Sequence, residues 1–184
     1  MNIYVFSGPC GCGKSTLTES YAQHLIKNGN NLQIYVIHGD DFHRGIKETD
    51  RRLGPDYPGF LYWDDILRFN WDCMLTVAQK ALDRGLDVLI DYVVEDELPL
   101  LQALASKYGA KLYYTVLTAS EDELRCRLIS RGDPHLIERS LFLKKELEST
   151  AGSYLFDISG MTVEDEIETL DIEAHEVPLA SAAP

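Results

Sequence analysis

Glycines, a lysine and a serine near the start of the chain have the spacing of a loop that binds phosphate groups. Residues 8–15 read Gly-Pro-Cys-Gly-Cys-Gly-Lys-Ser, which fits the P-loop pattern Gly-x-x-x-x-Gly-Lys-[Ser/Thr]. Glycines let the backbone turn its N–H groups inward, and the N-terminus of a following helix adds partial positive charge. An apolar run at 2–7 predicts the preceding strand, and the apolar periodicity of 14–28 predicts the helix.

The side chains of this loop suggest individual roles. Lys14 supplies positive charge for the β- and γ-phosphates of a nucleoside triphosphate, and the Ser15 hydroxyl can ligate Mg²⁺. Cys10 and Cys12 could form a metal pair, but their position inside the loop argues against a metal site. The residues expected to contact the nucleotide are Gly8, Pro9, Cys10, Gly11, Cys12, Gly13, Lys14, Ser15 and Thr16.

Carboxylates accompany the ends of two further apolar runs. Asp40 and Asp41 follow the run 32–38, and Asp91 lies near the end of the run 87–92. Ligands of open α/β sheets bind beyond the carboxyl ends of the strands, so these side chains are candidates for chemistry. We expect Asp40 or Asp41 to act as a general base or to hold a magnesium-bound water, and Asp91 to hold Mg²⁺ through water. The alternative is that each caps or turns the chain.

Two arginines on a later helix suit contacts with a nucleotide. Ser120 to Glu123 fits a capping box, and the helix that it opens carries Arg125, Arg127 and Arg131. Arg127 and Arg131 are four residues apart and therefore share a helix face. Arginine both stacks on flat bases and forks phosphate oxygens. A solvated basic face is the alternative, and it carries more weight for Arg125.

The segment 44–59 has the composition of a mobile loop over a substrate. It holds three glycines, two prolines and several basic residues. Its arginines could reach an anionic acceptor, and a solvated loop face is the alternative. A lone histidine such as His43 is more simply a packing or hydrogen-bonding group. The residues that we assign to an acceptor site are Asp41, His43, Arg44 and Arg52.

Strands and helices alternate along the chain, which predicts an α/β fold with a parallel sheet covered on both faces. One domain is expected over 1–173, followed by a flexible acidic tail at 174–184. Most of the rings near the start of the helix expected at 60–84 should pack in the core, and one or two could line a substrate pocket. These rings are Phe60, Tyr62, Trp63, Phe69 and Trp71. Other helices are expected at 96–108, 120–131, 135–149 and 162–170, and other strands at 111–117 and 154–158.

Composition and charge argue against several classes of protein. The chain of 184 residues is 45% apolar and 26% charged, as is usual for one globular domain. No apolar run approaches the roughly 20 residues of a membrane span, and no signal peptide is apparent, so we expect a cytoplasmic protein without a membrane partner.

The net charge is −13, and from Glu146 onward there are ten acidic residues and no Lys or Arg. This balance disfavours nucleic acid as a partner, and we interpret the acidic end as a solvated face and tail.

In their shared order, these motifs resemble the small P-loop kinases of the nucleoside, gluconate and shikimate kinase type and the AAA-type ATP-binding proteins related to them. The segment 38–43 is similar to Asp-Gly-Asp-x-x-His of gluconate kinases and to Asp-Gly-Asp-Asn of adenylylsulfate kinases, with His38 in place of the first Asp. The pair Arg127 and Arg131 is similar to Arg-x-x-x-Arg of nucleoside monophosphate kinases. Residues 156–164 resemble the last-strand segment of such kinases, whose turn borders the adenine. Chloramphenicol phosphotransferases and zeta toxins share the arrangement.

The resemblance spans nearly the whole chain. It implies a three-layer α/β/α P-loop NTPase fold whose five-stranded parallel sheet has the order 2-3-1-4-5. It also implies that Asp40 serves the acceptor or the metal, that Arg127 lies on the adenine and that Arg131 reaches phosphate.

Together these observations predict a phosphotransferase that uses ATP and Mg²⁺ and phosphorylates a hydroxyl group of a small molecule. Lys14, Asp40 and Arg131 are the expected catalytic residues, and Ser15 and Asp91 are the expected magnesium site. The main alternative is a nucleotide-binding switch or slow NTPase without an acceptor. A polynucleotide 5′-end kinase is a third option, which the acidic balance disfavours. The acceptor, the choice between ATP and GTP and the oligomeric state stay open.

Overall fold

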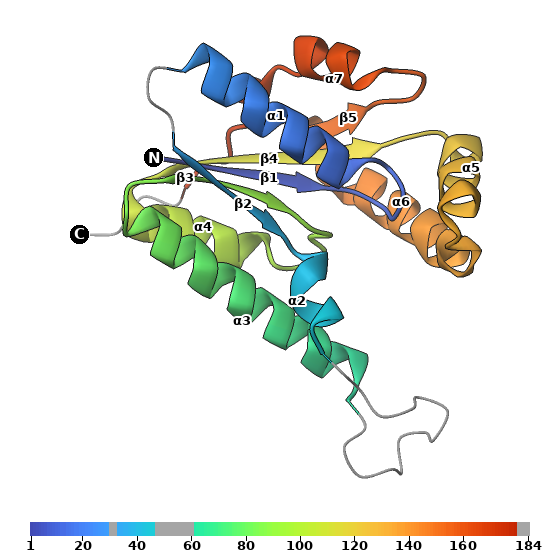
Figure 1. Cartoon of the computed structure of the whole chain (residues 1–184), viewed down its shortest axis with the longest axis horizontal. Coiled ribbons are helices and arrows are strands. Elements are labelled where there is room, and N and C mark those ends of the chain that lie inside the picture. Colours follow the sequence, from blue (N-terminus) through green and yellow to red (C-terminus); the bar gives the residue numbers. More distant parts are fainter. Residues whose placement is uncertain (30–32, 47–60, 180–184) are drawn as a thin grey trace.

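The chain folds around a five-stranded parallel sheet with helices on both faces (Figure 1). The structure is a computed structural model, and it describes residues 1–29, 33–46 and 61–179. The strand order is β2-β3-β1-β4-β5, which confirms the expected P-loop NTPase fold class. The strands are β1 (Asn2–Ser7), β2 (Ile34–His38), β3 (Asp87–Asp91), β4 (Lys111–Thr118) and β5 (Leu155–Asp157).

Two sets of helices supply the apolar side chains that cover the sheet. One set is α1 (Lys14–Asn28), α5 (Glu121–Arg131) and α7 (Val163–Thr169), and the other is α3 (Trp63–Leu82), α4 (Leu98–Tyr108) and α6 (Ile137–Ala151). Short 3₁₀ turns lie at η2 (Pro134–Leu136), η3 (Gly152–Tyr154) and η4 (Ile172–His175). Within the described ranges, none of the helices combines the length and the apolar character that a bilayer span requires.

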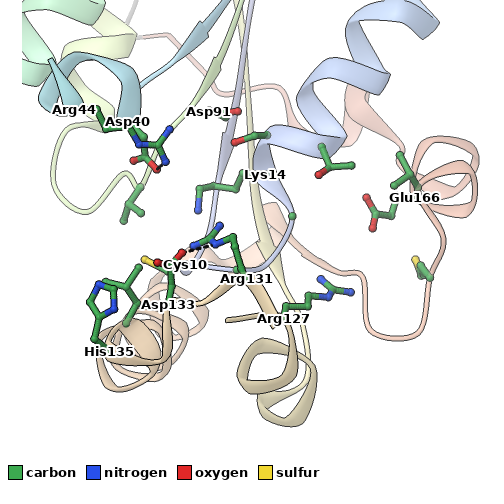
Figure 2. A pocket seen from close by; sticks show the side chains of 18 of the residues that line it. Cys10, Lys14, Asp40, Arg44, Asp91, Arg127, Arg131, Asp133, His135 and Glu166 are labelled. Atoms are coloured by element: carbon green, nitrogen blue, oxygen red, sulfur yellow. Dashed lines mark hydrogen bonds and ion pairs between the residues drawn. The ribbon is translucent and has the colours of Figure 1, made fainter. Parts of the chain in front are cut away.

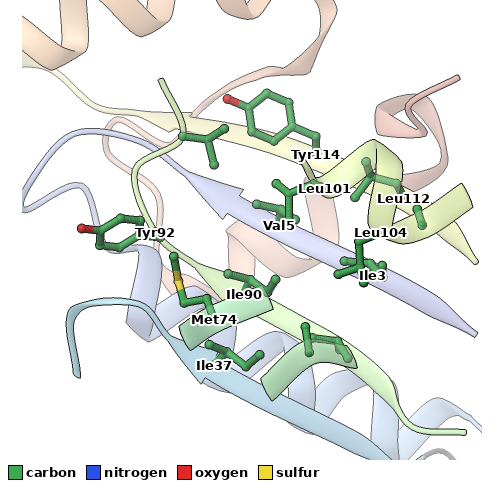
Figure 3. Packing of buried hydrophobic residues seen from close by; sticks show 14 of the residues in the cluster. Ile3, Val5, Ile37, Met74, Ile90, Tyr92, Leu101, Leu104, Leu112 and Tyr114 are labelled. Carbon is green, nitrogen blue, oxygen red and sulfur yellow. The ribbon is translucent and has the colours of Figure 1, made fainter. Parts of the chain in front are cut away.

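The central strand β1 joins the two halves of the core. Its side chains alternate, so that Ile3 and Val5 pack in one apolar cluster while Tyr4 and Phe6 pack in the other. Figure 3 shows the first cluster, where Leu101 of α4 lies against the side chains of β1. All five side chains are at most 7% exposed. Burial of each large apolar side chain contributes roughly 1.5–3 kcal/mol to folding.

The register of the parallel strands brings their carboxyl ends to one edge of the sheet. Phe6 of β1 pairs with Asp91 of β3, and Asp91 also pairs with His38 of β2. The P-loop leaves β1 at this edge, and the short helix α2 (Asp40–Arg44) begins just beyond β2. Candidate residues that are far apart in the sequence are therefore neighbours in space.

The aromatic residues at the start of α3 differ from the expectation of core packing. Trp71 is buried, but Tyr62, Trp63 and Phe69 are 56%, 46% and 48% exposed, so the prediction was wrong for these three rings. Phe69 lies off the buried face of α3, which repeats at Ile66, Asn70 and Met74, whereas Tyr62 is the N-cap and Trp63 the first residue of the helix. Phe60 lies outside the described residues.

The end of the chain also differs from the expected tail, because residues 174–179 pack against the sheet. Val177 is 3% exposed, and its backbone N–H donates to the Leu112 carbonyl oxygen at 2.7 Å. The His175 ring is buried, with Nδ1 2.7 Å from Thr115 Oγ1. These backbone and side-chain contacts hold this part of the segment on β4. Residues 180–184 lie outside the described residues.

Gly39 joins β2 to α2 in a tightly enclosed place. Its N–H donates to the Asp91 carbonyl oxygen at 2.9 Å, and its carbonyl oxygen accepts from Asn70 Nδ2 at 2.9 Å. A Cβ at this position would lie 2.3 Å from Cδ2 of Tyr92 and 2.8 Å from Sδ of Met74. The backbone immediately before Asp40 is therefore held by packing as well as by hydrogen bonds.

We predict that Gly39→Ala lowers the free energy of unfolding by about 1–3 kcal/mol, because the added methyl group overpacks this place. Equilibrium unfolding in urea, followed by tryptophan fluorescence, measures the change. Gly45→Ala is the control, since a Cβ there meets only the carbonyl oxygens of Phe42 at 3.2 Å and Asp41 at 3.9 Å. The control should change stability by less than about 0.5 kcal/mol. Equal unfolding midpoints for the two variants would contradict the prediction.

Candidate active site

The P-loop lies between β1 and α1 and turns closely against β4. Gly8 has a φ of +143°, and a Cβ there would lie 2.5 Å from the Leu117 carbonyl oxygen, so the turn requires glycine. The Lys14 ammonium donates to the carbonyl oxygens of Gly8 at 2.8 Å and Pro9 at 3.0 Å. These contacts keep the positive charge of Lys14 over the loop.

Two side chains from neighbouring helices brace the same loop. Ser140 Oγ of α6 donates to the Cys10 carbonyl oxygen at 2.7 Å, and Arg127 Nη1 of α5 donates to the Cys12 carbonyl oxygen at 3.0 Å. The Cys12 side chain is fully buried behind the loop, and this burial raises the pKa of its thiol. The loop is therefore supported from α5 and α6 through its own backbone.

A cleft of about 680 Å³ crosses the P-loop (Figure 2). It is lined by loop residues and by residues of α2, β3, α5 and α7. Among the predicted nucleotide contacts, Gly8, Pro9 and Cys12 belong to the loop but do not line the cleft. The predicted residues that do line it are Cys10, Gly11, Gly13, Lys14, Ser15, Thr16, Asp40, His43, Arg44, Asp91, Arg127 and Arg131.

Asp91 is a buried carboxylate beside the start of α1. It is 3% exposed, and it accepts a hydrogen bond from the Ser15 hydroxyl. Burial raises the pKa of Asp91, although its hydrogen bonds to His38 and Ser15 and the charge of Lys14 oppose the shift. In proteins Mg²⁺ takes one or two carboxylates, phosphate oxygens and water. The Ser15 hydroxyl and the Asp91 carboxylate supply oxygen atoms of the kind that such a magnesium site needs.

His38 links Asp91 to α1, a connection that the sequence did not reveal. Its Nδ1 lies 2.7 Å from Asp91 Oδ2, and its Nε2 lies 2.8 Å from Glu19 Oε1. Burial lowers the pKa of His38, but the bonds to both carboxylates raise it more, so the net shift is upward. A ring that donates from both nitrogens is an imidazolium, and its charge offsets that of Asp91. The sequence indicated His38 only as a departure from a family pattern.

The acidic pair after β2 lies in the first turn of α2. Neither acid is the N-cap, because Gly39 holds that position, so the capping alternative does not apply. Asp40 lines both the main cleft and an adjoining cleft of about 410 Å³, whereas Asp41 lines only the second. Arg44 pairs with Asp40 at 3.5 Å and with Asp41 at 3.3 Å, and all three side chains are more than half exposed.

The predicted acceptor site also includes His43 and Arg52, in addition to Asp41 and Arg44. His43 lines the main cleft, and its ring meets that of Trp63 edge-on at 5.8 Å between centroids. Arg52 lies outside the described residues. The described residues of this predicted acceptor site therefore lie on α2, and His43 also contacts the start of α3.

Two of the three arginines of α5, Arg127 and Arg131, line the main cleft, as their spacing suggested. Arg127 lies against the back of the P-loop, and its Nη2 is 3.7 Å from Glu123 Oε1. Arg131 Nε donates to Asp133 Oδ2 at 2.7 Å, so the side chain is held at the cleft wall. Arg125 is exposed and does not line the cleft, as expected for a side chain on a solvated helix face.

One residue of the acidic end belongs to the cleft instead of the solvated surface. Glu166 of α7 is 5% exposed and lines the cleft near Arg127. Burial raises its pKa, and the nearby charge of Arg127 opposes the shift. The interpretation of the acidic end as a solvated face was therefore wrong for this position. The only signal in the sequence was its place one turn after the capping residue Thr162.

Comparison with known proteins supports this assignment of the fold. A protein family described as an AAA domain matches residues 3–146. The guanylate kinase of Helicobacter pylori is 26% identical over 137 residues, which cover 71% of this chain and 65% of that protein. The match thus spans slightly less than two thirds of the length of this curated relative.

Solved structures of low sequence identity share the fold. The tunicamycin resistance protein of Deinococcus radiodurans aligns with a TM-score of 0.61 and 17% identity, over 96% of this chain and 98% of that one. A gluconokinase from Sinorhizobium meliloti aligns with a TM-score of 0.56 and 19% identity, over 95% and 89%. The family match covers more than half of the sequence and includes the P-loop, Asp40, Asp91 and both cleft arginines. The chain therefore belongs to the AAA domain family and has a P-loop kinase-like fold.

Proposed function

We propose that the protein transfers the γ-phosphoryl group of ATP to a hydroxyl group of a small molecule, with Mg²⁺. The observation that carries the proposal is one cleft lined by a P-loop lysine, by the exposed Ser15 beside the buried carboxylate of Asp91, and by the carboxylate of Asp40. A nucleotide-binding protein needs the first two features. A carboxylate beside the same cleft, on a separate helix, is the additional feature that phosphorylation of a hydroxyl group requires.

The proposed reaction assigns a role to each charged group. The acceptor oxygen bonds to the γ-phosphorus while the bond from that phosphorus to the β–γ bridging oxygen breaks, and ADP leaves. Asp40 accepts the proton of the acceptor hydroxyl. Lys14 and Arg131 offset the negative charge of the transferred group. Bound Mg²⁺ supplies further polarisation of the phosphate oxygens, held by Ser15 and by Asp91 through water.

Arg127 has a different task, because it lies behind the loop rather than over it. Its guanidinium is fixed to the Cys12 carbonyl oxygen, which leaves a planar cation at the cleft wall. A planar cation suits stacking on the adenine ring. Asp133 holds Arg131 through its Nε at the same wall, and this contact limits the rotamer entropy lost on phosphate binding.

An anionic acceptor such as a nucleotide is a second candidate. Arg44 and Arg131 both line the adjoining cleft, where positive charge would attract a phosphate. Guanylate kinase, by its name, acts on guanylate, so a nucleotide acceptor is consistent with that relationship. A switch or slow NTPase without any acceptor is the remaining alternative.

A screen for acceptors tests the proposal directly. The protein is heated with ATP, Mg²⁺ and panels of sugars, nucleosides, nucleotides and aminoglycosides, and compounds that raise the unfolding temperature are then assayed for phosphorylation by mass spectrometry. A phosphorylated alcohol supports the first candidate, and a phosphorylated nucleotide phosphate supports the second. ADP formation without any phosphorylated compound would contradict both and favour the NTPase.

Lys14→Ala should lower kcat/KM for phosphoryl transfer by at least about 10²-fold, because a preorganised charge at the transferred group is lost. The rate of ADP formation with the acceptor from the screen is the measurement. Lys145→Ala removes an exposed lysine of α6 outside the cleft and is the matched control. Similar activity for both variants would rule out the assigned role of Lys14.

Asp40→Asn should lower kcat by about 10²–10⁴-fold, since an amide cannot accept the proton of the acceptor hydroxyl. Asp41→Asn is the control, because Asp41 shares the contact with Arg44 but does not line the main cleft. We expect less than a tenfold effect from the control. A larger loss in Asp41→Asn than in Asp40→Asn would instead make Asp41 the base.

Ser15→Ala should weaken the dependence of ATP binding on Mg²⁺, because one proposed metal ligand is removed. Calorimetric titrations with ATP, with and without Mg²⁺, measure the change in affinity that the ion provides. Ser20→Ala, on the same helix but outside both clefts, is the control. If the ion strengthens ATP binding equally in both variants, Ser15 is not a ligand.

A further inference from the structure

Glu166 is a buried acid that the phosphoryl-transfer chemistry does not use. It is 5% exposed, and its carboxylate lines the cleft. Among the residues that the structure describes, no hydrogen bond or ion pair reaches this carboxylate. Arg127 is near enough to influence its pKa but not to pair with it. The oxygens of Glu166 are not among the fully enclosed, unpartnered side-chain atoms of the described residues, so the carboxylate faces the cleft, where a ligand can supply a partner.

The position of Glu166 separates it from the reacting end of the cleft. Figure 2 shows Asp40, Arg44 and Asp91 on one side of Lys14, and Arg127 and Glu166 on the other. The first side holds the proposed base and metal site. The second side is open to the base of a nucleotide whose phosphates lie at Lys14, and the cleft also extends past Cys10, Asp133 and His135.

The chemistry of this second side suits a flat aromatic ring. Arg127 presents a planar guanidinium that is fixed at the P-loop by the Cys12 carbonyl oxygen. Met161 and Val163 add apolar surface from the start of α7. A base between these groups gains stacking and apolar contact, and Glu166 then lies where it can meet the polar rim of the ring.

We propose that Glu166 accepts a hydrogen bond from the exocyclic amino group of the purine of the donor nucleotide. This inference rests on the proposed function in that it takes the nucleotide to be the phosphoryl donor bound at the P-loop. An ionised carboxylate has acceptors only, so it pairs with an amino group and opposes a carbonyl oxygen. Adenine offers N6–H₂, and guanine offers N2–H₂. Hypoxanthine lacks an exocyclic amino group and places a carbonyl oxygen at position 6.

The test compares the binding of ATP, GTP and ITP, each with Mg²⁺, by isothermal titration calorimetry. The unmodified protein should bind at least one of ATP and GTP about tenfold or more tightly than ITP, because ITP leaves the buried carboxylate without its donor. Whichever of ATP and GTP binds more tightly identifies the amino group as that of adenine or of guanine. Equal affinity for all three nucleotides would overturn the proposal without any variant.

Variants of Glu166 distinguish direct recognition of the base from a role in positioning Arg127. Glu166→Gln and Glu166→Ala should reduce the preference over ITP to less than about threefold, since the amide can also donate to a carbonyl oxygen and alanine makes neither contact. Glu164→Gln, an exposed acid of the same helix, is the matched control and should keep the preference. If Glu166 only positions Arg127, its variants weaken all three nucleotides by the same factor, and the proposal fails. Thermal unfolding checks that each variant is folded.

The comparison of nucleotide affinities gives its result whether or not the protein has a phosphoryl acceptor. Binding with a clear preference over ITP, but without any phosphorylated product in the acceptor screen, leaves this inference standing and removes the proposed function. Phosphoryl transfer at equal efficiency from ITP, ATP and GTP supports the function and overturns the role of Glu166.

Discussion

The parallel pairing of β1 with both β3 and β4 is the constraint on which the site depends. It places Phe6 beside Asp91 in one direction and Ser7 beside Val116 in the other, so three strands end at one edge. The Gly8 turn can then lie directly against the Leu117 carbonyl oxygen. Because a shift of register by one residue would invert the facing of every side chain in a strand, the same pairing determines both the core and the position of the loop.

Most charged side chains of the cleft lie near a side chain of opposite charge. Lys14 and His38 lie close to Asp91, Arg44 pairs with Asp40, and Asp133 holds Arg131. Glu166 departs from this pattern, because the nearby charge of Arg127 acts on its pKa without forming an ion pair with it. Balanced pairs keep charged groups in place at low cost, whereas an unbalanced buried acid is available to a ligand. The distribution thus separates the paired groups that organise the cleft from Glu166, whose carboxylate has no ion pair among the described residues.

Features that depend on neighbours in the chain were predicted well from the sequence. The helix expected at 14–28 coincides with α1, and the capping box expected at Ser120 forms. The P-loop spacing identified the turn after β1, and the resemblance to small kinases supplied the strand order, which apolar patterns alone do not encode. In each case the deciding interactions lie within a few residues or within a motif whose geometry is general.

Features that depend on distant packing were not predicted. The bond of His38 to Asp91 joins residues 53 positions apart, and the contact of Val177 with Leu112 needs a complete sheet. Glu166 belongs to an acidic run in which its neighbours are exposed, so no local pattern separates it from them. The exposure of Phe69 follows from the phase of α3, and Trp63 is exposed as the first residue of that helix. The abundance of aromatic residues indicated neither.

The braces of the P-loop have a consequence for its variation among related chains. Ser140 and Arg127 contact the carbonyl oxygens of residues 10 and 12, and every amino acid has a carbonyl oxygen. The shape of the loop is therefore insulated from the side chain at position 10, which can drift without loss of either contact. Position 12 is constrained in both size and polarity, because its side chain is fully buried among apolar residues. Divergence of the loop should thus be broad at one of its two cysteines and narrow at the other.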